Sequence, residues 1–95
     1  MGLTFEWDKQ KARENLRRRS VSFEESSTVF GDMMSITIDD PVHSIDEDRL
    51  VTIGLSYLGR ILVVVHTERG DNIRIISARL ATPRERRMYG EGTAG

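Results

Sequence analysis

The segment NIRIISARLATPRERRMY, residues 72–89, decides the fold, because it leads a buried strand directly into a short helix. Its β-branched residues suit a pleated surface that is covered on both sides, which indicates a central strand. Strict alternation predicts that this strand divides its side chains between two largely apolar faces, with Ile73, Ile75, Ser77 and Arg79 on one and Arg74, Ile76, Ala78 and Leu80 on the other.

The helix that follows this strand begins with clear start signals. Thr82 is placed to cap the first amides, Pro83 suits the first helical position, and Glu85 completes a capping box. The strand exit and the helix together place four arginines and a tyrosine around one junction: Arg79, Arg84, Arg86, Arg87 and Tyr89.

The arginine at the strand exit has two interpretations. Arg79 can hold a phosphate through two parallel hydrogen bonds and stabilise the negative charge that grows on it during a reaction. Alternatively, Arg79 pairs with Glu85 or Glu68, and the helix arginines form an ordinary solvated surface. The residues alone favour neither interpretation, and Arg74 carries the same ambiguity.

Length and composition limit the class of protein. The 95 residues are enough for one small domain, and we expect residues 1–89 to form it and the glycine-rich residues 90–95 to be a flexible tail. The chain contains no cysteine, which excludes disulfides and thiolate zinc sites. The start is too polar for a signal peptide, and no apolar run approaches the roughly 20 residues of a membrane helix. We therefore expect a cytoplasmic protein without membrane contact.

Charge is distributed unevenly along the chain. The net charge of −1 argues against nucleic-acid binding, but residues 39–48, DDPVHSIDED, hold five acidic groups and no Lys or Arg. Without those five groups the rest of the chain carries a net charge of +4. Residues 9–19, KQKARENLRRR, contain six basic groups and only Glu14 as an acid. The cations of this segment are therefore available for binding.

Two helices are expected before the sheet. Residues 5–7 form a short extended lead-in, and Asp8 is placed to cap a helix over residues 9–18. That helix has a narrow apolar stripe, so its basic face should lie in solvent. Ser22 and Glu25 form a second capping box, which starts the second helix.

Short β-branched runs predict the sheet. Residues 49–57 alternate in the manner of a half-buried strand, residues 61–67 form another run, and residues 35–38 are a candidate first strand. Short turns join these runs to the strand at residues 73–80 in an antiparallel meander. We therefore expect an α+β fold with two N-terminal helices, a three- to four-stranded antiparallel sheet covered on one face, and a short C-terminal helix.

The two histidines receive different interpretations. His66 lies near the end of a strand, on the same face as Leu62 and Val64, and its unperturbed pKa of about 6.5 suits a general acid or base. A lone histidine on a strand is nevertheless more often a hydrogen-bonded structural residue. His43 sits among the acids of residues 39–48, but the spacing matches no calcium loop, so a solvated loop is favoured over a metal site.

Several separate motifs occur in an order typical of one family. They are FEWD at residues 5–8, VSFEE at 21–25, DDPVHS at 39–44, RLVTIG at 49–54, and IRIISAR at 73–79 followed by TPRERRMY at 82–89. With these motifs the chain resembles, from Phe5 to Tyr89, the BrnT family, which is the toxin half of bacterial BrnT/BrnA type II toxin–antitoxin pairs.

The resemblance implies a RelE-like ribonuclease fold and a toxin that stops growth by cleaving cellular RNA. It also implies neutralisation by a BrnA antitoxin in a complex of two toxins and two antitoxins, with DNA reached only through the antitoxin. In toxins of this kind the ribose 2′-hydroxyl attacks the adjacent phosphate, so RNA is the required substrate and neither a metal nor another cofactor is needed. The alternative is a catalytically weak module that binds the antitoxin and acts in a DNA-binding repressor complex.

Matching positions carry the family's polar residues onto this chain. The resemblance implies charge stabilisation by Arg79 and Arg74. It implies proton transfer or substrate orientation by His66, and stacking or proton donation by Tyr89. The expected catalytic set is His66, Arg74, Arg79, Arg84 and Tyr89, and the expected RNA-binding set is Arg17, Arg18, Arg19, Arg49, Arg86 and Arg87.

One stretch departs from the family pattern. The family reads Lys-His-Gly where this chain has Arg18, Arg19 and Ser20. A guanidinium stays protonated at any useful pH, so Arg19 cannot replace a histidine in proton transfer. Ser20 replaces a glycine just after a helix, where a left-handed conformation costs on the order of 1 kcal/mol. We therefore expect weakened ribonuclease activity on an intact fold.

Overall fold

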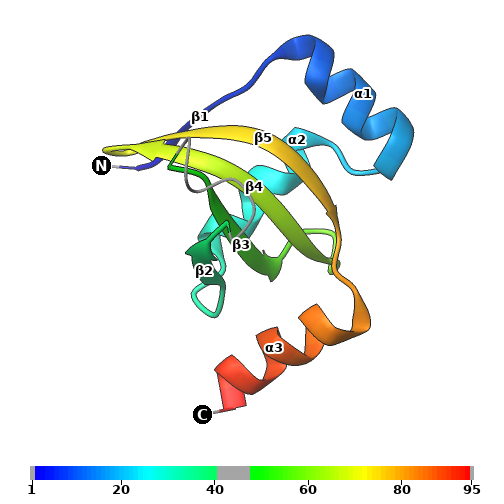
Figure 1. Cartoon of the computed structure of the whole chain (residues 1–95), viewed down its shortest axis with the longest axis vertical. Coiled ribbons are helices and arrows are strands. Elements are labelled where there is room, and N and C mark those ends of the chain that lie inside the picture. The colour runs from blue at the N-terminus through cyan, green and yellow to red at the C-terminus, as the bar shows by residue number, and fades with distance from the viewer. Residues whose placement is uncertain (1, 41–47, 95) are drawn as a thin grey trace.

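The computed structural model describes residues 2–40 and 48–94, which form a five-stranded mixed sheet with helices packed on both faces (Figure 1). The elements are β1 (Thr4–Glu6), α1 (Lys9–Arg19), α2 (Phe23–Ser27), the 3₁₀ helix η1 (Thr28–Gly31), β2 (Ile36–Asp39), β3 (Leu50–Leu55), β4 (Ile61–Arg69), β5 (Asn72–Leu80) and α3 (Pro83–Ala94). The strand order is β1-β5-β4-β3-β2, with β1 parallel to β5 and the other neighbours antiparallel. The α+β class predicted from the sequence is confirmed.

Strand number and direction differ from the predicted three or four antiparallel strands. The N-terminal lead-in is a strand, β1, which pairs in parallel with the start of β5 and places Phe5 opposite Ile73. The sequence did not reveal β1 because three residues are too few to show a two-residue period. The candidate first strand is present as β2, at the other edge of the sheet.

A β-bulge in β5 changes which side chains share a face. Val65 of β4 pairs with Ser77, but the next residue, His66, pairs with Ile75. Ile76 is therefore an extra residue on β5, and the strict alternation predicted from the sequence is wrong beyond it.

Because of the bulge, Arg74 and Arg79 lie on the same face of the sheet and not on opposite faces. Arg79 pairs with Val63 and Arg74 with Thr67, two residues that share one face of β4. Ala78 instead joins the face that α1 and α2 cover, where it is part of the main core. The two arginines thus point away from that core.

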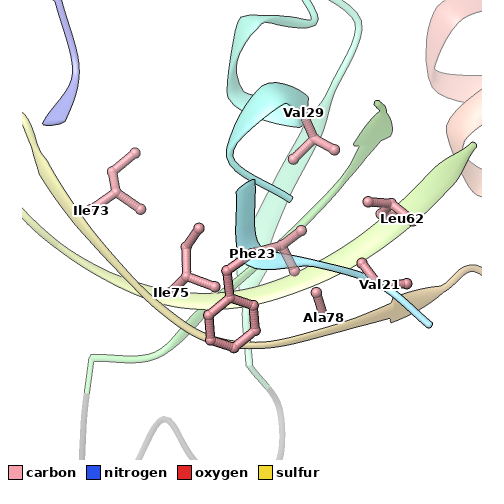
Figure 2. Close-up of a cluster of buried hydrophobic side chains, with 8 residues drawn as sticks. Val21, Phe23, Val29, Leu62, Ile73, Ile75 and Ala78 are labelled. Atoms are coloured by element: carbon pink, nitrogen blue, oxygen red, sulfur yellow. The ribbon is translucent and has the colours of Figure 1, made fainter. Parts of the chain in front are cut away.

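The main core lies between the sheet and the segment that contains α2 and η1 (Figure 2). Val21, Phe23 and Val29 from this segment pack against Leu62 and Ile75 of the sheet, and all five are buried. Burying each such side chain contributes about 1.5–3 kcal/mol. This packing, and not intrinsic helix propensity, explains why a helix of five residues is stable here.

A smaller core lies on the opposite face, where α3 contacts the sheet. It consists of Ile53, Val63 and Ala81, and Tyr89 of α3 packs against them. The cover is partial, because Leu55 on the same face remains 42% exposed. The sheet is therefore covered on one face and partly covered on the other.

The helix α3 extends beyond its predicted end. The sequence predicted a short helix to about Tyr89 and then a flexible tail, whereas the structure continues α3 to Ala94. Once a capped helix has started, each further residue adds one hydrogen bond, which offsets part of the low helix propensity of glycine. The end of the domain at residue 89 stays a prediction.

A buried carboxylate ties three separate segments together. Glu25 is 2% exposed, and its carboxylate accepts hydrogen bonds from Arg60 Nε at 2.9 Å and from Ser56 Oγ at 2.7 Å. Arg60 Nη2 also donates to Ser20 O at 3.0 Å. Only half of the predicted capping box is present, since Ser22 Oγ accepts from the Glu25 amide while the Glu25 side chain turns to Arg60.

The left-handed conformation of Ser20 generates a stability prediction. Ser20 has φ 58° and ψ 31°, as its position after α1 predicts. Ser20→Gly removes the steric strain of a Cβ in this conformation, and we expect the free energy of unfolding to rise by about 0.5–1 kcal/mol. Urea denaturation measures the change. Ser20→Ala keeps the Cβ and is the control, and equal stability of the two variants would contradict the strain.

The Glu25 network generates a second prediction. Glu25→Ala leaves Arg60 Nε and the Ser56 hydroxyl proton without their carboxylate acceptor, and we expect a loss of about 2–3 kcal/mol at pH 7 in chemical denaturation. Hydrogen bonding from Arg60 lowers the pKa of Glu25 from its ordinary 4.5. The stabilisation is therefore present above pH 4.5 and is lost as the pH falls through the lower pKa of the folded state. Exposed Glu24→Ala is the control, and an equal loss in both variants would refute the network's role.

Candidate functional site

The junction of β5 and α3 is built around an arginine–carboxylate pair. Arg79 Nη1 and Nη2 donate to Glu85 Oε1 and Oε2 at 2.7 and 2.8 Å, which is a bidentate pair. Glu85 Oε1 also accepts from the Thr82 amide at 2.9 Å, and Thr82 Oγ1 accepts from the Glu85 amide at 3.2 Å. The predicted capping box is confirmed, and so is the pairing of Arg79 with Glu85.

This pair fixes the charge state of Glu85 and the orientation of Arg79. The hydrogen bonds from Arg79 are the largest cause that lowers the pKa of Glu85, to about 2. The Arg79 side chain is 38% exposed. It therefore remains accessible from solvent, although Nη1 and Nη2 already donate to Glu85. An RNA phosphate at Arg79 must therefore share the guanidinium with Glu85 or displace it.

Three further arginines lie on α3, the helix that begins at this junction. Arg84, Arg86 and Arg87 are exposed, and no carboxylate within residues 2–40 and 48–94 forms an ion pair with them. They are the cations of the junction that remain available to an anionic ligand. Exposed cations without a bound carboxylate are the groups that phosphates bind.

Tyr89 attaches α3 to the end of η1. Its hydroxyl donates to Asp32 Oδ2 at 2.7 Å, and the same carboxylate accepts from the amides of Leu55 and Met34, each at 2.9 Å. The hydrogen bond to Asp32 raises the pKa of Tyr89 to about 12. Burial opposes ionisation of Asp32, but the three hydrogen bonds outweigh it and lower its pKa. Tyr89 is thus a neutral donor that is already engaged.

His66 is a core residue and does not belong to this junction. It is fully buried, its Nε2 lies 2.8 Å from Thr52 Oγ1, and its ring packs edge-on against Phe30 at 4.8 Å. Burial lowers the pKa of His66 to about 4, so the ring is neutral at pH 7. Its Nδ1 makes no hydrogen bond, although Glu68 Oε2 lies at 3.5 Å. Burial disfavours the expected proton transfer on RNA by His66, and this role stays a prediction.

Arg74 lies at the other end of β5 from Arg79. Their partners on β4, Thr67 and Val63, are four residues apart, which corresponds to about 13 Å along the sheet. Arg74 Nη1 pairs with Glu6 Oε2 at 2.7 Å, and Glu6 also accepts from Asn72. Together with Arg69 these residues line a pocket of about 310 Å³. Arg74 therefore shares a face with Arg79 but not a site.

The remaining expected RNA-binding residues fall in two places. Arg49 precedes β3 and lines a pocket of about 430 Å³ with three acids, Asp39, Asp48 and Glu68, which disfavours a phosphate there. The arginines at the end of α1, Arg17, Arg18 and Arg19, are exposed on the other side of the sheet from α3. His43 lies outside the described residues.

The sequence pointed to some partners of the site and missed others. Glu85 was visible as the capping-box acid and as one of two candidate partners of Arg79. Asp32 was not visible, because the hydrogen bond from Tyr89 joins residues 57 positions apart in the chain. Within the described parts of the chain, no group of three His, Cys, Asp or Glu side chains is placed to hold a metal ion, and no helix is long and apolar enough to span a membrane.

The fold and the junction define a small α+β protein in which arginines beside a strand–helix turn have no carboxylate partner among the described residues. A family model described as "Ribonuclease toxin, BrnT, of type II toxin-antitoxin system" matches residues 7–85, and the chain belongs to this family. A crystal structure of the Brucella abortus ribonuclease toxin BrnT superposes with a TM-score of 0.66 at 20% identity, covering 84% of this chain and 97% of that one. That likeness shows a shared fold. No curated protein matches the chain.

The burial of His66 generates a pH prediction. Because the folded chain binds this proton only near pH 4 and the unfolded chain binds it at pH 6.5, the free energy of unfolding should fall as the pH drops between these values. The expected loss from this group is about 3 kcal/mol. An NMR titration should give a midpoint near 4 for the His66 ring, and a midpoint near 6.5 would place the ring in solvent. His66→Gln is the control that should flatten this part of the pH profile.

Proposed function

We propose that this protein is a toxin that cleaves cellular RNA without a metal ion and that a BrnA-type antitoxin neutralises it. Membership of the BrnT family supports the toxin and ribonuclease assignment. The single observation that carries the site is the set of unpaired arginines on α3, Arg84, Arg86 and Arg87, beside the Arg79–Glu85 pair. We also assign the fold to the RelE-like group and the protein to the cytoplasm, where RNA is the available substrate.

The proposed reaction is an internal transfer on RNA. The ribose 2′-oxygen forms a bond to the adjacent phosphorus, and the bond from phosphorus to the 5′-oxygen breaks. The products are a 2′,3′-cyclic phosphate and a 5′-hydroxyl, and the proton lost by the 2′-hydroxyl is balanced by the one gained at the leaving oxygen. DNA cannot react because it lacks the internal nucleophile.

In this reaction the arginines stabilise charge. Arg79, held in plane by Glu85, and Arg84 on the first turn of α3 neutralise the additional negative charge on the phosphorus oxygens in the transition state. Tyr89 lies on the same helix and serves for stacking or for proton donation once it leaves Asp32. Arg74, far along β5, contributes by contacting the RNA backbone outside the reacting bond.

A second function, from a different class, is supported by the lack of a residue well suited to proton transfer among the three candidate positions. His66 is buried, Tyr89 has a pKa of about 12, and Arg19 stands where the family has histidine. A catalytically weak module that binds the antitoxin, with DNA reached only through that antitoxin, fits these three observations. The partly uncovered sheet face suits an amphipathic antitoxin segment, and we propose a complex of two toxins and two antitoxins.

Cleavage of RNA by the purified protein in the presence of a chelator tests the first function. Arg79→Ala should lower the cleavage rate at least about 100-fold, because it removes a donor to the developing charge. Arg79→Lys should recover only part of that loss, since a lysine cannot form the bidentate contact. The ends of the product should be cyclic phosphates.

The control for this experiment is Arg13→Ala, which removes an exposed arginine far from the junction. Circular dichroism should show that all variants are folded. Undiminished cleavage by Arg79→Ala would refute the site. RNA that stays intact with the wild-type protein, together with tight antitoxin binding, would reject the first function in favour of the second.

A further inference from the structure

We propose that one face of α1 is a second phosphate-binding site. It binds the RNA backbone at a distance from the β5–α3 junction, where the RNA is cleaved. The site consists of Lys11, Asn15, Arg18 and Arg19 on α1 and Ile76 on β5. This inference rests on the proposed function, because it takes the substrate to be RNA.

The pairing of cations distinguishes α1 from the sheet. Each of three arginines at the sheet holds a carboxylate: Arg60 pairs with Glu25, Arg74 with Glu6, and Arg79 with Glu85. In contrast, none of the six cations of α1 forms an ion pair with a carboxylate in the described segments. A guanidinium that already holds a carboxylate must share its donors with a phosphate or release the carboxylate. The cations of α1 have no such competitor.

The six cations divide into two stripes along the helix. Lys11 lies on one side of the helix with Asn15, Arg18 and Arg19, which follow it by four, seven and eight residues. They line a pocket of about 180 Å³ that also contains one acid, Glu14. This volume is below the roughly 300 Å³ at which pockets begin to hold drug-sized ligands, so it suits a phosphate group and not a whole nucleoside.

Hydrogen bonds to the sheet hold this pocket in shape. Asn15 Nδ2 donates to Val21 O at 2.9 Å, and Asn15 Oδ1 accepts from the Ala78 amide at 3.1 Å. These two bonds fix the middle of α1 against the part of β5 just after the bulge. Ile76, the extra residue of the bulge, contributes the wall on the side of the sheet. A preformed pocket loses less conformational freedom when it binds an anion.

The sheet leaves a path between α1 and α3. Figure 1 shows the two helices at opposite ends of the molecule. β1 pairs only with Asn72–Arg74, so the part of β5 from Ile75 to Leu80 has no strand beside it on that edge. The Ala78 amide on this edge is occupied by Asn15, so an RNA strand that lies in the α1 pocket would reach the junction with α3 past the last residues of β5, beyond Ala78.

Binding of a labelled 2′-O-methyl RNA, which cannot be cleaved by its own 2′-hydroxyl, tests the inference. The pocket variant is Lys11→Ala/Arg18→Ala. It should weaken binding about tenfold at moderate salt. The slope of log affinity against log salt should fall in magnitude by about 1.4, because each lost phosphate contact on a single strand removes about 0.7.

The matched control is Lys9→Ala/Arg13→Ala, which removes the same number of charges from the other stripe of the same helix. It should weaken binding less than threefold. Equal losses in the two variants would mean diffuse attraction to a basic helix and would overturn the inference. A DNA strand of the same sequence should show the same difference between variants, because the pocket contacts phosphate. A difference seen only with DNA would overturn the assignment to RNA.

Two further readouts separate this inference from the proposed function. Cleavage of ordinary RNA by the wild-type protein, with binding that is equal in both variants, would reject the α1 site and leave the ribonuclease intact. Absence of cleavage, with binding that depends on Lys11 and Arg18, would reject the ribonuclease and leave the α1 site. Loss of antitoxin binding in the pocket variant, with RNA binding unchanged, would overturn the site in favour of a protein partner.

Discussion

The extra residue at Ile76 determines where the functional groups of β5 lie. Without this bulge, strict alternation would place Arg79 on the same face as Ile73 and Ile75, inside the main core. A guanidinium there would lose its hydration without a partner, at a cost of several kcal/mol. Because of the bulge, Ile73 and Ile75 at the start of the strand pack in the main core, while Arg79 at its end lies on the other face. It also brings the Ala78 amide to Asn15 and thereby positions α1.

Charge pairing then decides which cations can act. An ion pair exposed to water contributes about 0–1 kcal/mol, so the Arg79–Glu85 pair orients the guanidinium more than it stabilises the fold. A phosphodiester carries the same single negative charge as the Glu85 carboxylate and offers the same bidentate geometry, so it can compete with Glu85 for the guanidinium at such a surface. Glu85 can then keep its second role, since the Thr82 amide still needs an acceptor. The buried Glu25–Arg60 pair differs, because its removal leaves buried groups unsatisfied.

Local patterns were readable from the sequence, and long-range ones were not. The caps at Asp8, Ser22 and Thr82, the left-handed Ser20 and the main strands follow from residue types within a few positions of one another. The partners of Glu25 and Tyr89 are 35 and 57 positions away, and no local signal identifies them. The site was also predicted only in part. Arg79, Arg84 and Tyr89 do gather around α3, but the sequence could not show that the face of His66 is buried under Phe30.

The side chains that could act as general base or acid limit the proposed mechanism more strongly than the arginines do. Attack by a 2′-hydroxyl needs a base, and Glu85, with a pKa of about 2, and His66, with its ring in the core, are both poorly suited to that role. Tyr89, with a pKa of about 12, is suited to give a proton to the leaving oxygen and not to remove one. Catalysis on this chain would then depend on stabilising the charged phosphorane, with water or hydroxide as the base. Such a reaction should quicken with rising pH until the base is no longer limiting, without the bell shape that a histidine pair produces.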